Sequence, residues 1–284
     1  MGHVEQRAMT RADLLTRLAE LIVARRPAHT LRVAIDGPDT AGKSTLAAEL
    51  GGRLAGVRET ILASVDGFHR PRRLRYRRGS LSPEGYYEDS FDHDALVLSL
   101  LRPLGPGGSG HYRTAVFDHR GDTERVEPTR HAGEGAVLLF DGIFLLRPGL
   151  RDFWDLSIYL EVSPDVAVRR ALTRDVELFG TVETVRERYR RRYLPAQRLY
   201  RAEASPTVRA DVVIDNDDPL RPGLRRWPSG PARVTRRRTR PEGCGGCAGA
   251  VSGYAPAFDI GRRGWPTRRR TTSSQRAGWC SPIC

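Results

Sequence analysis

The sequence predicts an α/β fold in which helices cover a parallel central sheet. Short apolar runs typical of strands occur at 31–36, 60–65, 135–140, 156–162 and 210–214. Helical spacing of apolar residues occurs at 11–25, 44–50, 164–177 and 182–193. Strands and helices that alternate in this way are typical of parallel sheets. Two parallel strands need a crossover connection between them, which is usually a helix.

Composition divides the chain into three parts. Residues 1–29 contain an amphipathic helix that ends before Pro27, and we expect this helix to pack against the main domain, residues 30–218. Residues 219–284 are rich in Arg, Gly and Pro and lack periodicity, so we expect a disordered tail. Nearly all of the formal net charge of +13 belongs to this tail, so the charge gives no reason to expect the main domain to bind nucleic acid.

All four cysteines, Cys244, Cys247, Cys280 and Cys284, also lie in the tail. Their unequal spacing and the terminal position of the second pair argue against a zinc site. The main domain contains no cysteine, so packing and not disulfides must hold it together.

The first strand leads into a phosphate-binding loop, Gly37-Pro-Asp-Thr-Ala-Gly-Lys-Ser44, followed by a helix. Lys43 is the only lysine among 47 basic residues, which suggests that the loop needs its compact charge. Backbone N–H groups and the helix dipole would surround a phosphate, and Ser44 would offer its hydroxyl to Mg²⁺. The sequence therefore predicts a P-loop NTPase three-layer sandwich that binds ATP with Gly37, Pro38, Asp39, Thr40, Ala41, Gly42, Lys43, Ser44 and Thr45.

Two acids follow strands at the sheet edge where ligands gather in such folds. Asp66 comes after the second strand and Asp141 after the third. We expect Ser44, Asp66 and Asp141 to arrange the Mg²⁺ ion, and Asp66 to accept a proton from a substrate hydroxyl. The alternative is that each acid only caps a turn before the following glycine.

Several motifs in order give a more specific resemblance. They are the phosphate loop, Ser64–His69, Ser90–Ala95, Phe140–Ile143 and Arg174–Asp175. Together, over roughly residues 30–217, they resemble the uridine kinase family, whose members are P-loop kinases similar to phosphoribulokinase and bacterial pantothenate kinase. The resemblance implies ATP-dependent phosphorylation of a nucleoside 5′-hydroxyl, that of uridine or cytidine.

The resemblance also implies residue roles. Asp66 would be the general base, with Lys43 and Arg174 as the other catalytic residues. Asp92 would accept hydrogen bonds from the ribose hydroxyls, with Phe91 packing beside it. The remaining substrate contacts would come from His69, Phe117, His119 and Arg170.

The sequence departs from this family after Asp175, where an Arg-Gly-Arg segment is usual and Glu177–Thr181 stands instead. Arg174 is then the best cation for the transferring phosphate, with Arg169 or Arg170 on the same helix able to reach inward. The arginines of 186–192 could substitute, or form a solvated helix face. For the Arg-rich segment 70–79 we favour a substrate-side loop over a nucleic-acid-binding patch.

The chain lacks a run of about 18 apolar residues and an apolar secretory signal, so we expect a cytoplasmic protein with a small-molecule substrate and no membrane partner. Oligomerisation is common among relatives, so a homo-oligomer stays open. Two other functions also stay open. One is a related P-loop kinase of another small hydroxyl acceptor, such as a phosphorylated sugar or a pantothenate-like compound, and the other is a nucleotide-gated protein that binds RNA through its basic tail.

Overall fold

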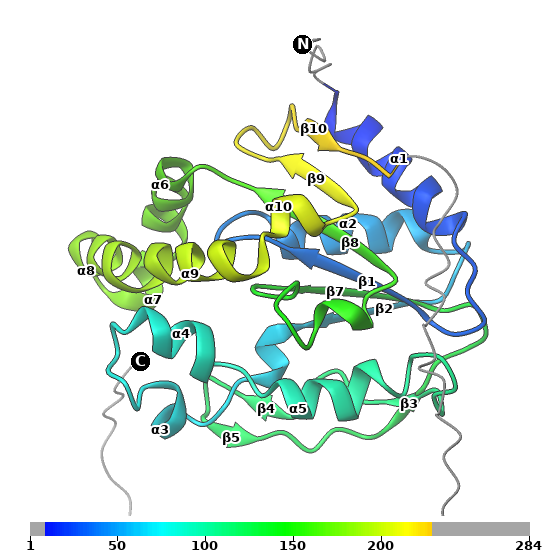
Figure 1. Ribbon diagram of the computed structural model, residues 1–284, viewed down its shortest axis with the longest axis horizontal. Coiled ribbons are helices and arrows are strands. Elements are labelled where there is room, and N and C mark those ends of the chain that lie inside the picture. Colours follow the sequence, from blue (N-terminus) through cyan, green and yellow to red (C-terminus); the bar gives the residue numbers. More distant parts are fainter. Residues whose placement is uncertain (1–8, 229–284) are drawn as a thin grey trace, which may run out of the picture. The chain divides into compact units, whose positions relative to one another are not determined.

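The computed structural model describes residues 9–228, in which a six-stranded sheet lies between two layers of helices (Figure 1). The strand order is β10-β9-β8-β1-β7-β2, and every neighbouring pair is parallel except β9 and β10. The strands are β1 Leu31–Asp36, β2 Thr60–Ser64, β7 Val137–Gly142, β8 Leu156–Glu161, β9 Val212–Asp215 and β10 Gly223–Arg226. The α/β sandwich and all five predicted strands are confirmed.

Helices and short hairpins fill the connections. The α-helices are α1 Arg11–Val23, α2 Lys43–Leu54, α3 Arg72–Arg75, α4 Pro83–Asp89, α5 His93–Leu96, α6 Pro164–Arg174, α7 Val176–Phe179, α8 Val182–Arg188, α9 Leu194–Ala204 and α10 Pro206–Arg209. Single turns of 3₁₀-helix occur at Val65–Phe68 and Arg151–Phe153, and π-helical turns at Val97–Leu101 and Tyr189–Tyr193. Two small ribbons pair β3 His111–Tyr112 with β6 Arg130–His131 and β4 Phe117–Asp118 with β5 Thr123–Glu124.

Strand alternation assigns the side chains of β1 to two separate cores. Leu31, Val33 and Ile35 face the layer of α1 and α2, where Leu14, Leu18 and Ile22 of α1 are fully buried, together with Leu46 and Leu50 of α2. Ala34 faces the opposite layer. Since successive side chains of a strand point to opposite faces, Asp36 also belongs to that second side.

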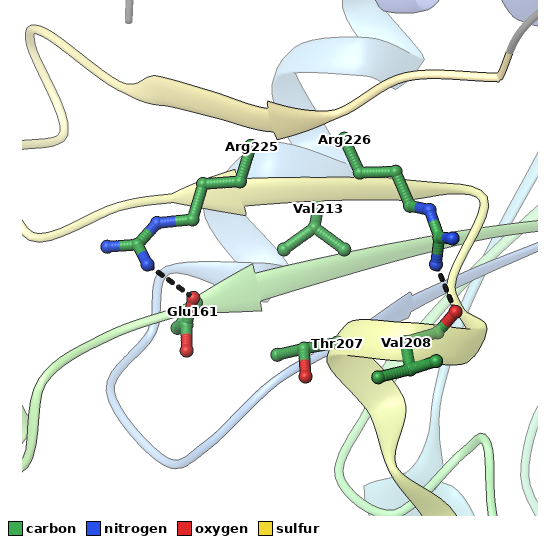
Figure 2. A pocket seen from close by; sticks show the side chains of 6 residues that line it. All are labelled: Glu161, Thr207, Val208, Val213, Arg225 and Arg226. Carbon is green, nitrogen blue, oxygen red and sulfur yellow. Dashed lines mark hydrogen bonds and ion pairs between the residues drawn. The ribbon is translucent and has the colours of Figure 1, made fainter. Parts of the chain in front are cut away.

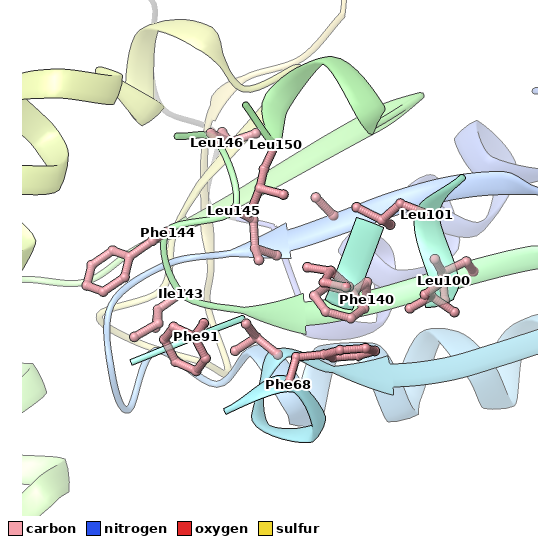
Figure 3. Packing of buried hydrophobic residues seen from close by; sticks show 14 of the residues in the cluster. Phe68, Phe91, Leu100, Leu101, Phe140, Ile143, Phe144, Leu145, Leu146 and Leu150 are labelled. Atoms are coloured by element: carbon pink, nitrogen blue, oxygen red, sulfur yellow. The ribbon is translucent and has the colours of Figure 1, made fainter. Parts of the chain in front are cut away.

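The second core lies between the sheet and the segments that follow β2 and β7 (Figure 3). Phe140 of β7 stacks on Trp154 with ring centroids 5.5 Å apart, and Phe68 lies 6.2 Å from Phe140. Phe91 belongs to the same cluster and is only 2% exposed. The loop segments that carry the predicted site are therefore anchored in the core by aromatic side chains.

The predicted start of the disordered tail at residue 219 is wrong. Residues 223–226 form β10, which pairs antiparallel with β9. Arg225 contributes to this strand through contacts with Asp215 at 2.6 Å and Glu161 at 3.3 Å. The arginine content that suggested a tail is thus used to neutralise carboxylates at the sheet edge. The remainder of the predicted tail, with its cysteines and arginine clusters, lies outside the described residues.

The helix predicted to end at residue 193 continues to Ala204 in spite of Pro195. A proline inside a helix lacks the N–H that would bond the preceding turn and clashes with its carbonyl. The chain adopts a π-helical turn over Tyr189–Tyr193, just before the proline, and α9 then begins with Pro195 in its first turn. Widening the turn relieves the clash, so two helical segments run on as one continuous element.

The N-cap of α4 is Ser82, whose side chain accepts a hydrogen bond from the Gly85 N–H. Within residues 9–228, every helix is too short or too polar to cross a lipid bilayer.

Asp36, at the end of β1, is fully buried beside Tyr200 of α9. The Tyr200 hydroxyl donates to Asp36 Oδ2 and accepts from the Leu146 N–H at 3.0 Å, while Asp36 Oδ1 accepts from the Gly37 N–H at 2.7 Å. Burial raises the pKa of Asp36, and the hydrogen bonds from Tyr200 and Gly37 oppose that rise. One hydroxyl thus connects β1, the loop after β7 and α9.

We predict that Tyr200→Phe lowers the free energy of unfolding by about 1–3 kcal/mol, because it removes a partner from a buried carboxylate. Urea denaturation measures the change. Tyr76→Phe is the matched control, because the Tyr76 hydroxyl has no hydrogen bond within residues 9–228, and it should change stability by less than about 0.5 kcal/mol. Equal losses in the two variants would contradict the role of Tyr200.

Candidate active site

The phosphate loop has the backbone shape that an anion site requires. Gly42 adopts a left-handed conformation with φ 87° and precedes α2 without any side-chain cap for the helix N-terminus. Gly37 has φ 150°, and a Cβ atom there would lie 2.5 Å from the Leu160 carbonyl oxygen. The N–H groups of the first turn of α2 are thus free of side-chain capping bonds, which fits a phosphate group.

Side chains outside the loop hold it in this shape. Thr40 has the left-handed φ of 62°, and its hydroxyl donates to the Ala167 carbonyl of α6 at 2.9 Å. Arg170 donates to the Thr40 carbonyl at 3.2 Å and to the Asn216 carbonyl at 2.7 Å. Asn216 in turn donates through its side-chain amide to the Ala41 carbonyl at 2.8 Å. The loop is therefore fixed from α6 and from the end of β9.

Arg170 was predicted to contact the substrate, and that contact stays a prediction. Its guanidinium is engaged by backbone carbonyls on the β9 side of the loop. Asp66 follows β2, at the opposite edge of the sheet. Helical spacing puts an arginine on a face of α6 but does not reveal what that face meets.

Lys43 lies inside the loop, 9% exposed, with its ammonium donating to the Pro38 carbonyl at 2.7 Å. Burial lowers the pKa of Lys43, and the carboxylates of Asp39, Asp36, Asp141 and Asp66 oppose that shift. The single ammonium is thus surrounded by acids from four different places in the sequence. Its carbonyl contact occupies one of its three donors, which leaves the others for phosphate oxygens.

The Ser44 hydroxyl donates to Asp141 Oδ2 at 2.7 Å. Strand alternation turns Asp141 toward α2, opposite to Phe140, and so brings it to the first turn of that helix. Burial raises the pKa of Asp141, whereas Ser44 and Lys43 lower it. Within residues 9–228, no three acidic, histidine or cysteine side chains form a ready metal cage. A Mg²⁺ ion held by Ser44 and Asp141 would therefore draw further ligands from nucleotide phosphates, as is usual for this ion.

Asp66 lies in the 3₁₀ turn after β2, with its side chain 64% exposed. His69 Nε2 is 3.5 Å from Asp66 Oδ1, and His69 Nδ1 is 3.1 Å from the Ser90 carbonyl oxygen. The surrounding protein opposes ionisation, but the hydrogen bond and charge of His69, with His119 and Lys43, lower the pKa of Asp66. Asp66 is thus an accessible and ionised carboxylate, as a general base must be.

Aromatic rings lie beside Asp66. The His69 ring is 4.5 Å from Phe91 and 4.7 Å from His119. Phe91 and Phe117 are only 2% and 6% exposed, whereas His69 and His119 are partly exposed. Asp92 caps α5 by accepting from the Ala95 N–H at 2.9 Å through Oδ1, which leaves Oδ2 for another donor.

Arg174, the cation expected to serve the transferring phosphate, is bound to the neighbouring Asp175. Arg174 donates to Asp175 through Nε at 2.6 Å and Nη2 at 3.2 Å, and Tyr189 donates to the same carboxylate at 3.0 Å. Among the downstream arginines, Arg192 is buried and donates to the Ser80 carbonyl at 2.9 Å. Arg192 therefore ties the helix after the lid to the segment that follows Asp66.

The Arg-rich segment 70–79 is folded against its surroundings through ion pairs. Arg77 and Arg78 both contact Asp89, and Arg75 contacts Asp122 at 3.3 Å. The hydrogen bonds and charges of Arg77 and Arg78 lower the pKa of Asp89. The segment thus lies next to α4 and the β4–β5 ribbon, close to Asp66 and Asp92 in the chain.

A separate hollow of about 450 Å³ lies between α10, β9 and β10 (Figure 2). Arg225 crosses it to Glu161, and Arg226 donates to the Val208 carbonyl. None of the predicted site residues lines it.

Sequence reasoning did not find Tyr86 and Asn216. Tyr86 donates to Asp39 Oδ1 at 2.9 Å, and Asn216 bonds the loop carbonyl of Ala41. Neither residue belongs to a pattern with the loop, because the contacts cross 47 and 175 positions of the chain. Only the position of Asn216, directly after a strand at the ligand-binding edge, was a usable signal.

Fold and loop together define a P-loop nucleotide-binding kinase. The sequence model of the phosphoribulokinase / uridine kinase family matches residues 33–216. The chain belongs to this family, and the resemblance found in its motifs is confirmed.

Named relatives agree with the family but are distant. A uridine kinase of Shewanella amazonensis is 29% identical over 193 residues, covering 64% of this chain and 85% of that protein. One from Clostridium perfringens is 26% identical over 191 residues with the same coverage. A solved structure named a possible uridine kinase from Bacillus stearothermophilus has a TM-score of 0.55 at 25% identity, covering 71% of this chain and 97% of that one. A candidate fructose transport system kinase from Silicibacter sp. TM1040 has a TM-score of 0.55 at 27% identity, covering 69% and 96%.

We predict that Arg170→Ala weakens ATP binding by about tenfold, because charge-assisted hydrogen bonds of about 1.5–3 kcal/mol hold the loop carbonyls. Isothermal titration with a non-hydrolysable ATP analogue measures the affinity. Arg169→Ala is the matched control, since Arg169 is the exposed neighbour on the same helix and makes no hydrogen bond or ion pair within the described residues. A normal affinity in Arg170→Ala would exclude the clamping role.

Proposed function

We propose that this kinase transfers the γ-phosphate of ATP to the 5′-hydroxyl of a pyrimidine nucleoside, uridine or cytidine. The observation that carries the proposal is the contact of Asp66 with His69, which joins an ionised carboxylate to a row of aromatic rings. A planar base could lie against the partly exposed rings of His69 and His119 while its ribose reaches Asp92. The names of the relatives point to the same acceptor.

In this mechanism Asp66 accepts the proton of the attacking hydroxyl. Its lowered pKa keeps it ionised near neutral pH. Lys43 neutralises charge on the β- and γ-phosphates, and Arg174 exchanges its contact with Asp175 for the transferring group. Ser44, Asp141 and Asp66 would hold Mg²⁺, which shields phosphate charge when bound.

A second candidate is a kinase of an acceptor without a base, such as a sugar derivative. Two observations favour it: Phe91 and Phe117 have almost no exposed ring surface, and one similar structure carries the name of a sugar-transport kinase. The row that remains for a base is then formed by two imidazoles.

We predict that Asp66→Asn lowers kcat by about 10²–10⁴ while ATP still binds, because a general base contributes about that factor. ADP release with Mg²⁺-ATP and uridine, cytidine, adenosine, pantothenate, ribulose 5-phosphate or no acceptor is the measurement. Asp152→Asn, at a carboxylate whose side chain is 86% exposed, is the control and should keep full activity.

Turnover that depends on uridine or cytidine and is lost in Asp66→Asn would support the nucleoside proposal. Turnover only with a sugar phosphate or pantothenate would move the function to the second candidate. Acceptor-dependent turnover that survives in Asp66→Asn would contradict the role of Asp66 whichever acceptor is used.

A further inference from the structure

The phosphate loop contains a carboxylate, Asp39, that the proposed mechanism does not use. Such a loop surrounds an anion, so a negative charge within it opposes phosphate binding unless it is directed toward something else. Asp39 is also the largest electrostatic influence of any acid on Lys43. Its position therefore has a cost for nucleotide binding, and the side chain must face a group that offsets this cost.

The hydrogen bonds of Asp39 show which way it points. Its Oδ1 accepts from the Tyr86 hydroxyl at 2.9 Å. Tyr86 belongs to α4, which ends two residues before Phe91 and three before Asp92. The carboxylate is thus directed at α4, the helix that leads in the chain to Phe91 and Asp92.

The Tyr86 ring and the backbone next to Asp39 are both held in place by other residues. The Tyr86 ring packs edge-on against Tyr193 at 4.8 Å and Phe144 at 5.5 Å, and Arg192 lies over it at 4.9 Å. On the other side, the left-handed Thr40 next to Asp39 is held by Ala167 and Arg170. The direction of the Asp39 side chain is consequently built into the fold.

The second oxygen, Asp39 Oδ2, is buried and has no hydrogen-bond partner within residues 9–228. A buried carboxylate oxygen without a partner is unfavourable, so a ligand that donates to it gains binding energy. Phosphate groups of ATP only accept. In the proposed mechanism the remaining donors of Lys43 and the guanidinium of Arg174 bind phosphate oxygens. The donor that remains is a group on the acceptor molecule.

We propose that Asp39 determines acceptor specificity: its free oxygen accepts a hydrogen bond from a hydroxyl or amino group of the acceptor, distinct from the hydroxyl that is phosphorylated. The inference rests on the proposed function to the extent that a small hydroxyl compound is the acceptor, but it does not depend on that compound being a nucleoside. Asp39 and Asp92 would then bind two different donor groups of one molecule.

The test compares wild type, Asp39→Ala, Tyr86→Phe and the control Asp152→Asn. Each is assayed for kcat/KM with the best acceptor of the wild type and with analogues of that acceptor that each lack one hydroxyl or amino group. For uridine these are the 2′-deoxy and 3′-deoxy compounds. The affinity for a non-hydrolysable ATP analogue is measured in parallel.

We expect one analogue to lose about 10- to 100-fold in kcat/KM with wild type and with Asp152→Asn, since a hydrogen bond to a charged group contributes about this factor. In Asp39→Ala the same analogue should match its parent acceptor within about threefold, with ATP affinity unchanged or increased. Tyr86→Phe keeps the free oxygen but loosens it, so the discrimination should shrink several-fold. This second variant also serves if Asp39→Ala fails to fold.

Two results would overturn the inference. In one, Asp39→Ala discriminates among the analogues as wild type does. In the other, it slows every acceptor and the hydrolysis of ATP by water equally, which would assign Asp39 to the positioning of Arg174. If the best acceptor is no nucleoside, the nucleoside proposal fails and the analogue series is made on that acceptor. If no acceptor is turned over, the melting temperatures of wild type and Asp39→Ala are compared with each acceptor in the presence of the ATP analogue. Equal shifts in the two proteins would overturn both the nucleoside proposal and the inference about Asp39.

Discussion

The structure depends on a loop that cannot stabilise itself. A phosphate-binding loop must keep its N–H groups free for an anion, so it loses the internal hydrogen bonds that normally fix a turn. Here its carbonyls and flanks are held by other elements: Arg170 and Ala167 of α6, Asn216 after β9, and the Asp36–Tyr200 pair beneath it. Much of the polar interior between sheet and helices can be understood as support for eight residues.

The arrangement of charged side chains around the loop follows from the same need to bind an anion. One ammonium, Lys43, lies among acids that come from β1, the loop itself, the turn after β2 and the end of β7. Without a nucleotide, Lys43 is the shared counter-charge of these four carboxylates. When phosphate groups enter, the acids must meet other partners, and each of the four has one in reach: Asp36 has Tyr200, Asp39 has Tyr86, Asp141 has Ser44, and Asp66 has His69.

The sequence predicted what depends on local patterns. Strands came from apolar runs, the loop from its motif, and Asp66 and Asp141 from their places after strands. It did not reveal contacts that depend on a distant partner: Arg170 donates to the Thr40 carbonyl of the loop, and Tyr86 donates to Asp39. Pro195 and Arg225 led to wrong predictions for a related reason. A π-helical turn accommodates Pro195 within a continuous helix, and the carboxylates of Glu161 and Asp215 neutralise Arg225 within a strand.

The antiparallel strand β10 has a consequence for the exposed margin of the sheet. Without it, β9 would present a row of unpaired backbone groups, which is a template for pairing with another chain. β10 covers that row and is itself a poor template, because its register shifts between Leu224 and Arg226 and it carries two arginines. A shortened protein cut after Asp218, where the composition changes, would lose this protection and become prone to self-association through its sheet.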